Sequence, residues 1–316
     1  MNCRAADTLE RANLAPAGLL VACLAALAPL CAAALEGPPP AAAQEDAPEL
    51  APADLKLDRY KPGEDGRPQW VGEELEYGIR WHGVPAGRAL LKVKRRERFP
   101  EPDGPETWLV RLDIRSSRIV STFHPLRNKT QSQIDVKGGF SRYFSKEQNE
   151  GRYEMRERVL PDYALDKLEA GYEFPQPCRA TQDAQGRART PWKKLAIPLN
   201  GKVLDPLSAV YRLRSLDLAP GKTIVLPILT ERRVWNTRIK VEGRERLEVP
   251  ALGGSQPCLV LAPECQFNGL FERRGPLRIW VHEATKVVVK LAAETPIGAC
   301  EALLEAHRNS PLNAAE

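Results

Sequence analysis

The histidines and cysteines are the side chains of this chain that could act as metal ligands or nucleophiles, and they are few. The sequence of 316 residues contains 4 His and 7 Cys. His82, His124, His282 and His307 are far apart, whereas a zinc-binding helix needs two His one turn apart. One sheet face could bring His82 and His282 together, but two solvent-facing imidazoles are the simpler interpretation. We therefore predict no metal site.

The motifs of hydrolytic and nucleotide-binding sites do not occur in the sequence either. It contains no Gly-x-Ser-x-Gly nucleophile elbow, and no Lys-Ser or Lys-Thr follows Gly253-Gly254 to complete a phosphate-binding loop. Glu73 and Glu74 are adjacent, so on a strand they point to opposite faces and cannot act on one bond. We expect both to be surface charges. The sequence therefore predicts a protein that is not an enzyme, without catalytic residues or cofactors.

Composition and charge narrow the class of protein and its partners. The 46 basic and 41 acidic residues give a net charge of +5. Their signs alternate along the chain instead of forming a basic face, so no nucleic-acid partner is expected. With 43% hydrophobic and 28% charged residues, the chain is expected to be mainly globular.

The amino terminus has the pattern of an export signal. Basic residues, the last of them Arg11, precede an uncharged run over residues 12–35 that ends in Ala32-Ala33-Ala34. Small residues fit the cleavage pocket of a signal peptidase, which predicts a signal peptide over residues 1–34. The rest of the chain is then exported to the periplasm or cell envelope.

Two alternatives remain for this terminus. The uncharged run is long enough to stay uncleaved as a membrane anchor, although its prolines and alanines weaken that interpretation. Leu20-Val21-Ala22-Cys23 is similar to a bacterial lipobox, with Cys23 as the lipidated residue. All three interpretations place the rest of the chain outside the cytoplasm.

The cysteines beyond the signal region are Cys178, Cys258, Cys265 and Cys300. In an oxidising compartment, an even number predicts two disulfides. Cys258 and Cys265 flank a predicted strand end and turn that could bring their sulfurs together, which leaves Cys178 to pair with Cys300. Four thiolates around zinc would need the short paired spacing that these cysteines do not have.

Beyond the signal region, the chain reads as one domain with flexible ends. Residues 35–68 are rich in Pro and Ala and have no periodicity, so they are expected to form a disordered tether. Residues 69–306 form the predicted globular domain, followed by a polar tail over residues 307–316.

Within the domain, apolar residues recur at every second position. Leu75, Tyr77, Ile79 and Trp81 alternate with polar residues, and Gly83–Gly87 is expected to turn the chain into the next strand. The same alternation continues in three further segments, 108–114, 235–241 and 277–281. This periodicity predicts a mostly β, antiparallel fold connected as a meander.

One short helix is expected to interrupt the strands. Asp205-Pro206 has the pattern of an N-cap and first helical residue, and Leu207, Val210 and Tyr211 share one face of the next two turns. That face should cap the sheet or barrel. We interpret Asp205 as a helix cap and not as a catalytic acid.

Three blocks of sequence resemble a known family. They are Val71-Gly72-Glu73-Glu74-Leu75-Glu76-Tyr77 with Gly83-Val84-Pro85-Ala86-Gly87, then residues 204–214 with the helix motif Asp205, Pro206, Ser208 and Tyr211, and Leu277-Arg278-Ile279-Trp280-Val281. In these blocks the chain resembles the DUF3108 family of exported bacterial proteins. The resemblance implies an envelope location and a single domain of strongly curved antiparallel sheet, an open or partial barrel similar to lipoprotein carriers, and brings no catalytic residues.

The aromatic residues are the candidate ligand contacts. In a closed sandwich they would fill the core, whereas in an open barrel the inward face would line a groove. Trp280 lies on the opposite face from Ile279 and Val281, which indicates a contact at the rim or on the second face. The predicted ligand-binding residues are Tyr77, Trp81, Trp108, Trp235, Trp280 and Tyr211.

Taken together, the sequence predicts a non-enzymatic envelope protein that binds a lipid or another apolar or amphipathic ligand in a curved β-sheet. Arginine and lysine at the rim would favour anionic head groups. One alternative is an envelope assembly or scaffold protein that binds a partner protein through an exposed sheet edge. The other is an unrecognised hydrolase, which would require two carboxylates, or His82 and His282, to meet beside a bound molecule.

Overall fold

The structure is a computed structural model that describes residues 70–99, 103–151, 153–164, 167–175, 181–182, 188–189, 192–230, 232–264, 277–295 and 298–310. The predicted signal peptide with Cys23, the tether, Cys178, Cys265 and most of the tail lie outside the described residues.

Strands make up most of the described chain. The first group comprises β1 (Glu74–Trp81), β2 (Val84–Arg98), β3 (Glu106–Ser116), β4 (Arg127–Asp135), β5 (Ser141–Glu150), β6 (Tyr153–Ala164), β7 (Lys167–Pro175) and β10 (Trp192–Pro198). The second group comprises β11 (Thr223–Thr230), β12 (Arg233–Val249), β13 (Gly254–Glu264), β14 (Arg278–His282), β15 (Val288–Thr295) and β16 (Gly298–Arg308). The two-residue strands β8 (Thr181–Gln182) and β9 (Ala188–Arg189) pair only with each other.

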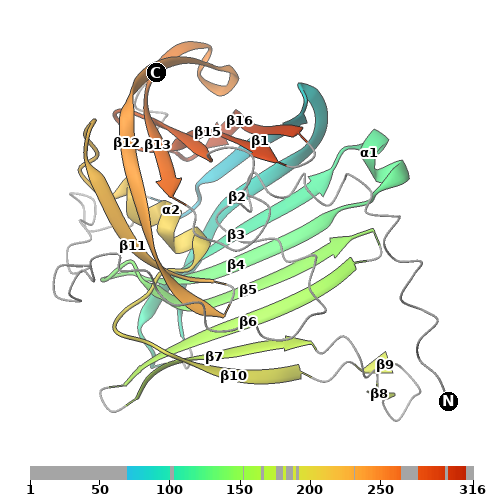
Figure 1. The fold of residues 1–316 in the computed structure, drawn as a ribbon, viewed down its shortest axis with the longest axis vertical. Coiled ribbons are helices and arrows are strands. Elements are labelled where there is room, and N and C mark those ends of the chain that lie inside the picture. The colour runs from blue at the N-terminus through green and yellow to red at the C-terminus, as the bar shows by residue number, and fades with distance from the viewer. Residues whose placement is uncertain are drawn as a thin grey trace.

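The two groups form one antiparallel sheet of 14 strands, which confirms the predicted fold class (Figure 1). Each group is a meander, and pairing of β1 with β16 joins them. The sheet is not closed, because β10 and β11 are its two edges. Register shifts occur in β1, β2, β4, β12 and β14, and such bulges increase the local twist and bend of a strand. They explain why one sheet curls around an interior.

The β1–β2 turn is tighter than the sequence predicts. It consists of His82 and Gly83, both with positive φ, of 47° and 77°, as a type I′ hairpin turn requires. The expected turn over Gly83–Gly87 is therefore wrong, because most of it belongs to β2. Gly87 is needed for another reason: a Cβ there would lie 2.6 Å from the carbonyl oxygen of Arg115 on β3.

The described residues contain two α-helices, where the sequence predicts one. The expected helix is α2 (Pro206–Arg214), which begins after Asp205. The unexpected helix is α1 (Arg118–Phe123), in the connection between β3 and β4. It has six residues and contains Ile119, Val120 and Thr122, which are poor helix formers, so propensity does not reveal it. A 3₁₀ turn, η3 (Pro250–Leu252), links β12 to β13.

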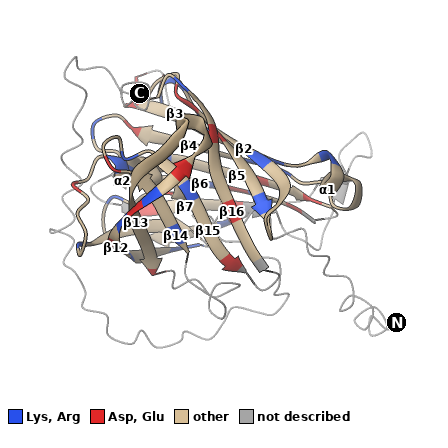
Figure 2. Cartoon of the chain, turned by 90° about the horizontal axis from the view of Figure 1, so that it is seen from above, with Lys and Arg blue, Asp and Glu red and all other residues tan. Residues whose placement is uncertain are grey.

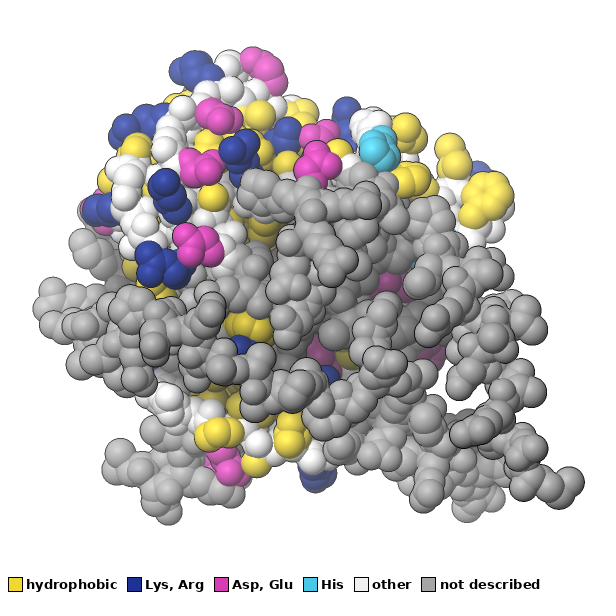
Figure 3. Space-filling view, in the orientation of Figure 1, with side chains coloured by type: hydrophobic (Ala, Val, Ile, Leu, Met, Phe, Trp, Pro, Cys, Tyr) yellow, Lys and Arg dark blue, Asp and Glu magenta, His cyan; other side chains and the backbone are white. Residues whose placement is uncertain are grey.

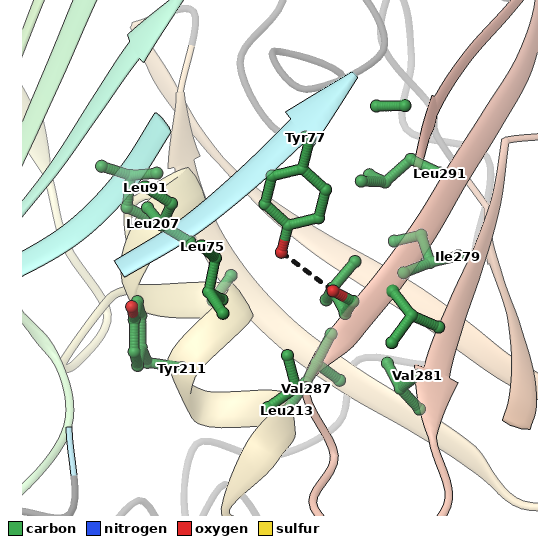
Figure 4. Close-up of a cluster of buried hydrophobic side chains, with 14 of the residues drawn as sticks. Leu75, Tyr77, Leu91, Leu207, Tyr211, Leu213, Ile279, Val281, Val287 and Leu291 are labelled. Carbon is green, nitrogen blue, oxygen red and sulfur yellow. Dashed lines mark hydrogen bonds between the residues drawn. The ribbon is translucent and has the colours of Figure 1, made fainter. Parts of the chain in front are cut away.

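The main core lies between α2 and the inner face of the sheet (Figure 4). Leu207, Tyr211 and Leu213 of α2 are buried, as are Leu75 and Tyr77 of β1. From the other group of strands, Ile279 of β14, Val281 of β14 and Leu291 of β15 complete this cluster. Burial of a large apolar side chain contributes about 1.5–3 kcal/mol, so this cluster holds the two strand groups together.

A short segment before α2 connects the edge strand β11 with β5. The N–H of Ser141 on β5 donates to the carbonyl of Val203, and Leu204 forms a parallel bridge with Ile228 on β11. Around this segment Phe144, Val159 and Tyr172 pack with Leu199, Val203 and Leu229 in a second, smaller core. The interior is therefore apolar at the end of the sheet that carries α2.

Candidate functional site

A buried ion pair lies under α2. The two terminal guanidinium nitrogens of Arg214, Nη1 and Nη2, donate to the carboxylate of Glu73, at 2.7 and 2.8 Å. The Tyr211 hydroxyl donates to the same carboxylate at 3.0 Å. The side chains of Arg214 and Glu73 are 2% and 0% exposed. The prediction that Glu73 is a surface charge is therefore wrong.

Aromatic rings surround this pair. The Arg214 guanidinium lies 5.1 Å from the ring centroid of Trp70 and 5.0 Å from that of Tyr211, and Trp70 meets Trp108 edge-on. Burial and the nearby charge of Glu73 raise the pKa of Tyr77 and of Tyr211 well above the ordinary value of 10.0. These phenols therefore stay protonated. The Tyr77 hydroxyl donates to the carbonyl of Val288 (Figure 4).

This cluster has the chemistry of a structural clamp. The carboxylate oxygens, the two terminal guanidinium nitrogens and the two phenol hydroxyls bond to one another or to backbone. A buried pair of this kind is stable only when it is fully hydrogen-bonded. Glu73 and Arg214 both belong to the sequence blocks that resemble the family. Their presence in these blocks is the feature of the sequence from which their pairing could have been inferred.

Asp205 is the N-cap of α2. Its Oδ1 accepts hydrogen bonds from the N–H groups of Leu207 and Ser208, and the Ser208 hydroxyl accepts from the N–H of Asp205. Its other oxygen accepts from the Ser132 hydroxyl on β4 at 2.6 Å. Burial raises the pKa of the Asp205 carboxyl, and its hydrogen bonds act in the opposite direction. Asp205 thus caps the helix and also ties it to the sheet.

A different set of polar side chains lies farther along the same inner face of β4, β5, β6 and β7. We call it the inner polar face, and it consists of Asn128, Thr130, Lys146, Gln148, Glu150, Glu157 and Tyr172. The bond between Ser132 and Asp205 shows which face of β4 points toward α2. Alternate residues along a strand share a face, so Thr130 and Asn128 point the same way. All seven residues are buried, at most 8% exposed.

The register arranges the inner face in rows that become more polar away from α2. Phe144 pairs with Ser132 and Val159 in a mainly apolar row. In the next row Lys146 pairs with Thr130 and Glu157. Farther out, Gln148 pairs with Met155, and Glu150 forms a bridge with Leu126.

Hydrogen bonds hold these polar groups in place. Glu150 accepts from Asn128 at 2.7 Å and from Gln148 at 3.2 Å, and Tyr172 bonds to Glu157. Burial raises the pKa of Glu150, while Asn128, Gln148 and the charge of Lys146 act in the opposite direction. Buried carboxyl, amide and ammonium groups therefore lie directly beside the apolar row of Phe144 and Val159.

The structure does not gather the six predicted aromatic residues into one site. Tyr77, Trp108 and Tyr211 belong to the core under α2. Trp81 is half-buried beside the ring of His82 at the end of β1. Trp235 packs under the guanidinium of Arg233, 3.5 Å from its ring centroid.

Trp280 lies on the second face of β14, as the alternation predicts. Its indole N–H donates to Glu245 at 2.7 Å, and the ammonium of Lys290 lies 5.2 Å from its ring centroid. Trp280 is 8% exposed and counts among the buried residues of the main hydrophobic cluster. Sequence reasoning identified none of the inner polar face, because its members are ordinary strand residues that only the register brings together.

His82 of the β1–β2 turn and His282 of β14 do not meet. His82 lies near the end of β15. Its neighbour Trp81 pairs with Cys300 of β16, and Cys300 pairs with Ala293 of β15. His282 instead bonds to Val287, just before the start of β15. His82 is exposed, but His282 is 3% exposed, so the prediction that both face solvent is wrong for His282.

Cys258 and Cys300 are free, buried thiols in the structure. Their predicted disulfide partners, Cys265 and Cys178, lie outside the described residues, so both pairings stay predictions. Burial and the charges of Glu245 and Glu283 raise the pKa of Cys258 to about 11. A thiol with that pKa is a poor nucleophile at neutral pH.

Two further findings concern the described part of the chain. Within it, no three His, Cys, Asp or Glu side chains are grouped closely enough to hold a metal ion. None of its helices combines the length and the apolar character that crossing a bilayer demands.

Comparison with known proteins gives one family and several distant structures. The model of the family described as "Protein of unknown function (DUF3108)" matches residues 76–305. None of the curated proteins matches the chain.

Among solved structures, a β-barrel-like DUF1849 protein from Brucella abortus has a TM-score of 0.44 at 9% identity, over 75% of this chain and 97% of that one. A candidate exported protein with a YmcC-like fold from Bacteroides fragilis has a TM-score of 0.31 at 8% identity, over 75% of this chain and 96% of that one. A candidate lipoprotein from Parabacteroides distasonis has a TM-score of 0.29 at 10% identity, over 76% of this chain and 96% of that one.

Proposed function

The chain belongs to the DUF3108 family, described as proteins of unknown function, and on that premise we propose that it is a non-enzymatic protein of the cell envelope that binds an amphipathic molecule against the inner polar face. The observation that carries this proposal is the graded inner face of β4 to β7. Its rows change from Phe144 and Val159 to Lys146, and then to Glu150.

The grading matches a ligand with an apolar part and a polar head. An apolar tail would contact Phe144, Val159 and Tyr172, where burial stabilises at roughly 25 cal/mol per Å². A polar head would exchange hydrogen bonds with Lys146 and Glu150, which orient a ligand in a mostly apolar site. The envelope location rests on the export pattern of residues 1–34.

The edges of the sheet give less support to a scaffold that acts by strand addition. The edge strand β11 contains Pro227, and the edge strand β10 contains Lys194 and Pro198. Proline and lysine are residues that natural proteins place on edges to prevent pairing with other strands. Part of β11 is also occupied already, because Ile228 forms a bridge with Leu204.

The experiment is native mass spectrometry of the protein purified in mild detergent from the envelope of the organism that makes it. We expect an added mass from an amphipathic molecule on the wild type. In Lys146→Met that mass should be lost or much reduced, because the polar head loses its cationic partner. The matched control is Lys129→Met on the exposed side of β4, which should keep the added mass. A wild-type protein that carries no added mass would refute the proposal.

A further inference from the structure

The most exposed apolar side chains of the described residues lie together at one end of the sheet. We propose that this end docks on an anionic phospholipid surface through an apolar tip, consisting of Val84, Ile119 and Phe123, and a neighbouring arginine row, consisting of Arg88, Arg115 and Arg127. This inference does not depend on the proposed ligand, since a membrane-docking surface and an interior binding face are separate properties.

The apolar tip stands out from the rest of the described surface. Phe123 is 84% exposed, Ile119 is 76% exposed and Val84 is 63% exposed. The other large hydrophobic residues classed as exposed among the described residues, Val71, Leu160 and Leu195, are only 39–41% exposed. Ile119 and Phe123 are four residues apart on α1, so they share one face of the helix.

The three residues of the tip come from neighbouring segments. The N–H of Ser117, the N-cap of α1, donates to the carbonyl of Ala86 just after the β1–β2 turn, at 2.8 Å. Val84 belongs to the start of β2 beside that turn. Figures 1 and 2 show α1 at one extremity of the molecule, at the ends of β3 and β4. In Figure 3, hydrophobic side chains are exposed at the same extremity.

The shape of this tip suits a membrane better than a protein partner. It is built from a hairpin turn and a six-residue helix at strand ends, so its highly exposed apolar side chains come from two short neighbouring segments. Protein interfaces are well packed and shape-complementary, whereas a bilayer accepts a projecting Phe or Ile without a matching pocket. Apolar groups of interfacial proteins enter the bilayer by about 5–10 Å.

The arginine row supplies the charge that an anionic surface would neutralise. Arg88 of β2 pairs directly with Arg115 of β3, and Arg115 pairs with Arg127 of β4. Like charges in directly opposite positions destabilise a sheet, so this arrangement costs stability unless an anionic partner is present. All three side chains are exposed; Arg88 also bonds to Glu76.

The sequence around the tip is basic throughout. Residues 77–96 and residues 114–134 contain no Asp or Glu. Arg80 and Arg118, both exposed, add to the three arginines of the row. Arg115 and Arg127 lie three to four residues from the ends of α1, or roughly 10 Å at about 3.3 Å per residue. That spacing would place guanidinium groups at the phosphates while the tip enters the lipid.

The test is flotation of the full exported chain with vesicles, combined with hydrogen exchange. Vesicles of phosphatidylcholine with phosphatidylglycerol should bind the chain more tightly than vesicles of phosphatidylcholine alone. Hydrogen exchange of residues 114–127 should slow when the anionic vesicles are added, a local readout that binding through the amino terminus would not produce.

Variants separate the contributions of the tip and the row. Ile119→Ser with Phe123→Ser should lower affinity for anionic vesicles at least about tenfold, because two large apolar side chains no longer enter the lipid. Arg115→Gln with Arg127→Gln should lower it by about fivefold per arginine, with the effect shrinking as salt is raised.

Matched controls remove the same chemistry elsewhere on the sheet. Leu160→Ser with Leu195→Ser, and Arg238→Gln with Arg278→Gln, should leave vesicle binding unchanged. The proposal is overturned if the tip variant floats like the wild type, or if exchange of residues 114–127 is the same with and without anionic vesicles. Slowed exchange that requires a partner protein and not lipid would overturn it as well.

Discussion

Replacing Glu73 with Gln should reveal the ion pair under α2 as a main support of the fold. The substitution keeps the size of the side chain but removes its charge, so the Arg214 guanidinium stays 2% exposed without a carboxylate. Removing one partner of a buried pair costs about 3–5 kcal/mol. For a domain of this size, 1 kcal/mol lowers Tm by roughly 2–4 °C, so we expect Tm to fall by about 6–20 °C. Urea unfolding followed by tryptophan fluorescence measures the change in free energy.

The control for this substitution is Glu76→Gln on β1, three residues after Glu73. Glu76 also bonds to an arginine, but the side chains of Arg88 and Glu76 are 73% and 36% exposed. An exposed pair contributes about 0–1 kcal/mol, so Glu76→Gln should change the unfolding free energy by less than about 1 kcal/mol. If Glu73→Gln has an effect as small as the control, our assignment of the clamp is incorrect.

A double variant tests the same reasoning from the opposite direction. Glu73→Leu with Arg214→Met replaces both charges by apolar groups, which leaves no buried charge without a partner. Such replacements are often neutral or even stabilising. The double variant should therefore be more stable than either single variant, and additive losses would contradict the account.

Four further predictions follow from single positions. Asp205→Ala should lower the unfolding free energy by about 2 kcal/mol through loss of the cap of α2, with Asp205→Asn closer to the wild type, both measured by urea unfolding. Gly87→Ala should cost about 1–3 kcal/mol, because the new Cβ would meet the Arg115 carbonyl at 2.6 Å; a neutral result in thermal unfolding would contradict that contact. Burial, with the charge of Lys286, lowers the pKa of His282, so the unfolded chain takes up this proton at a higher pH than the folded chain. The contribution of neutral His282 to stability is thus complete above the ordinary pKa of 6.5 and is lost as the pH falls below it. Between pH 7.5 and pH 5.5, urea unfolding should show a smaller fall in unfolding free energy for His282→Asn than for the wild type. The thiol of Cys258 should resist iodoacetamide in the folded protein, and after unfolding it should react even without reductant. If the unfolded protein reacts only when reductant is added, Cys258 forms the predicted disulfide instead.

The regular part of the fold follows from alternation of side chains in the sequence. Leu75, Tyr77 and Ile79 of β1 are at most 2% exposed, because burial of one face dominates the choice of strand and register. The helix after Asp205 follows from the local chemistry of its cap. Both signals depend on neighbours in sequence, which is why they can be recognised without a structure.

The sites depend on contacts between distant residues and could not be predicted in this way. The sequence predicts Glu73, like the adjacent Glu74, as a surface charge, because its partner Arg214 lies 141 positions away in the chain. The inner polar face requires the register of four strands, and no single strand shows it. The helix α1 has six residues and contains poor helix formers, so the sequence predicts neither this helix nor its exposed Ile119 and Phe123.

Binding of an amphipathic molecule against the inner polar face can be tested directly with a photoreactive side chain at residue 155. The sequence contains 2 Met, and the second is Met155, which pairs with Gln148 on the inner face. Cells supplied with photo-methionine would carry a photoreactive diazirine at this position, and illumination followed by mass spectrometry would identify what it touches. We expect a cross-link between residue 155 and an amphipathic small molecule. We expect none when Met155→Leu is combined with Leu160→Met, which moves the diazirine to the exposed face of β6. Cross-links of residue 155 to protein alone, or equal lipid cross-linking from both positions, would contradict binding at this face.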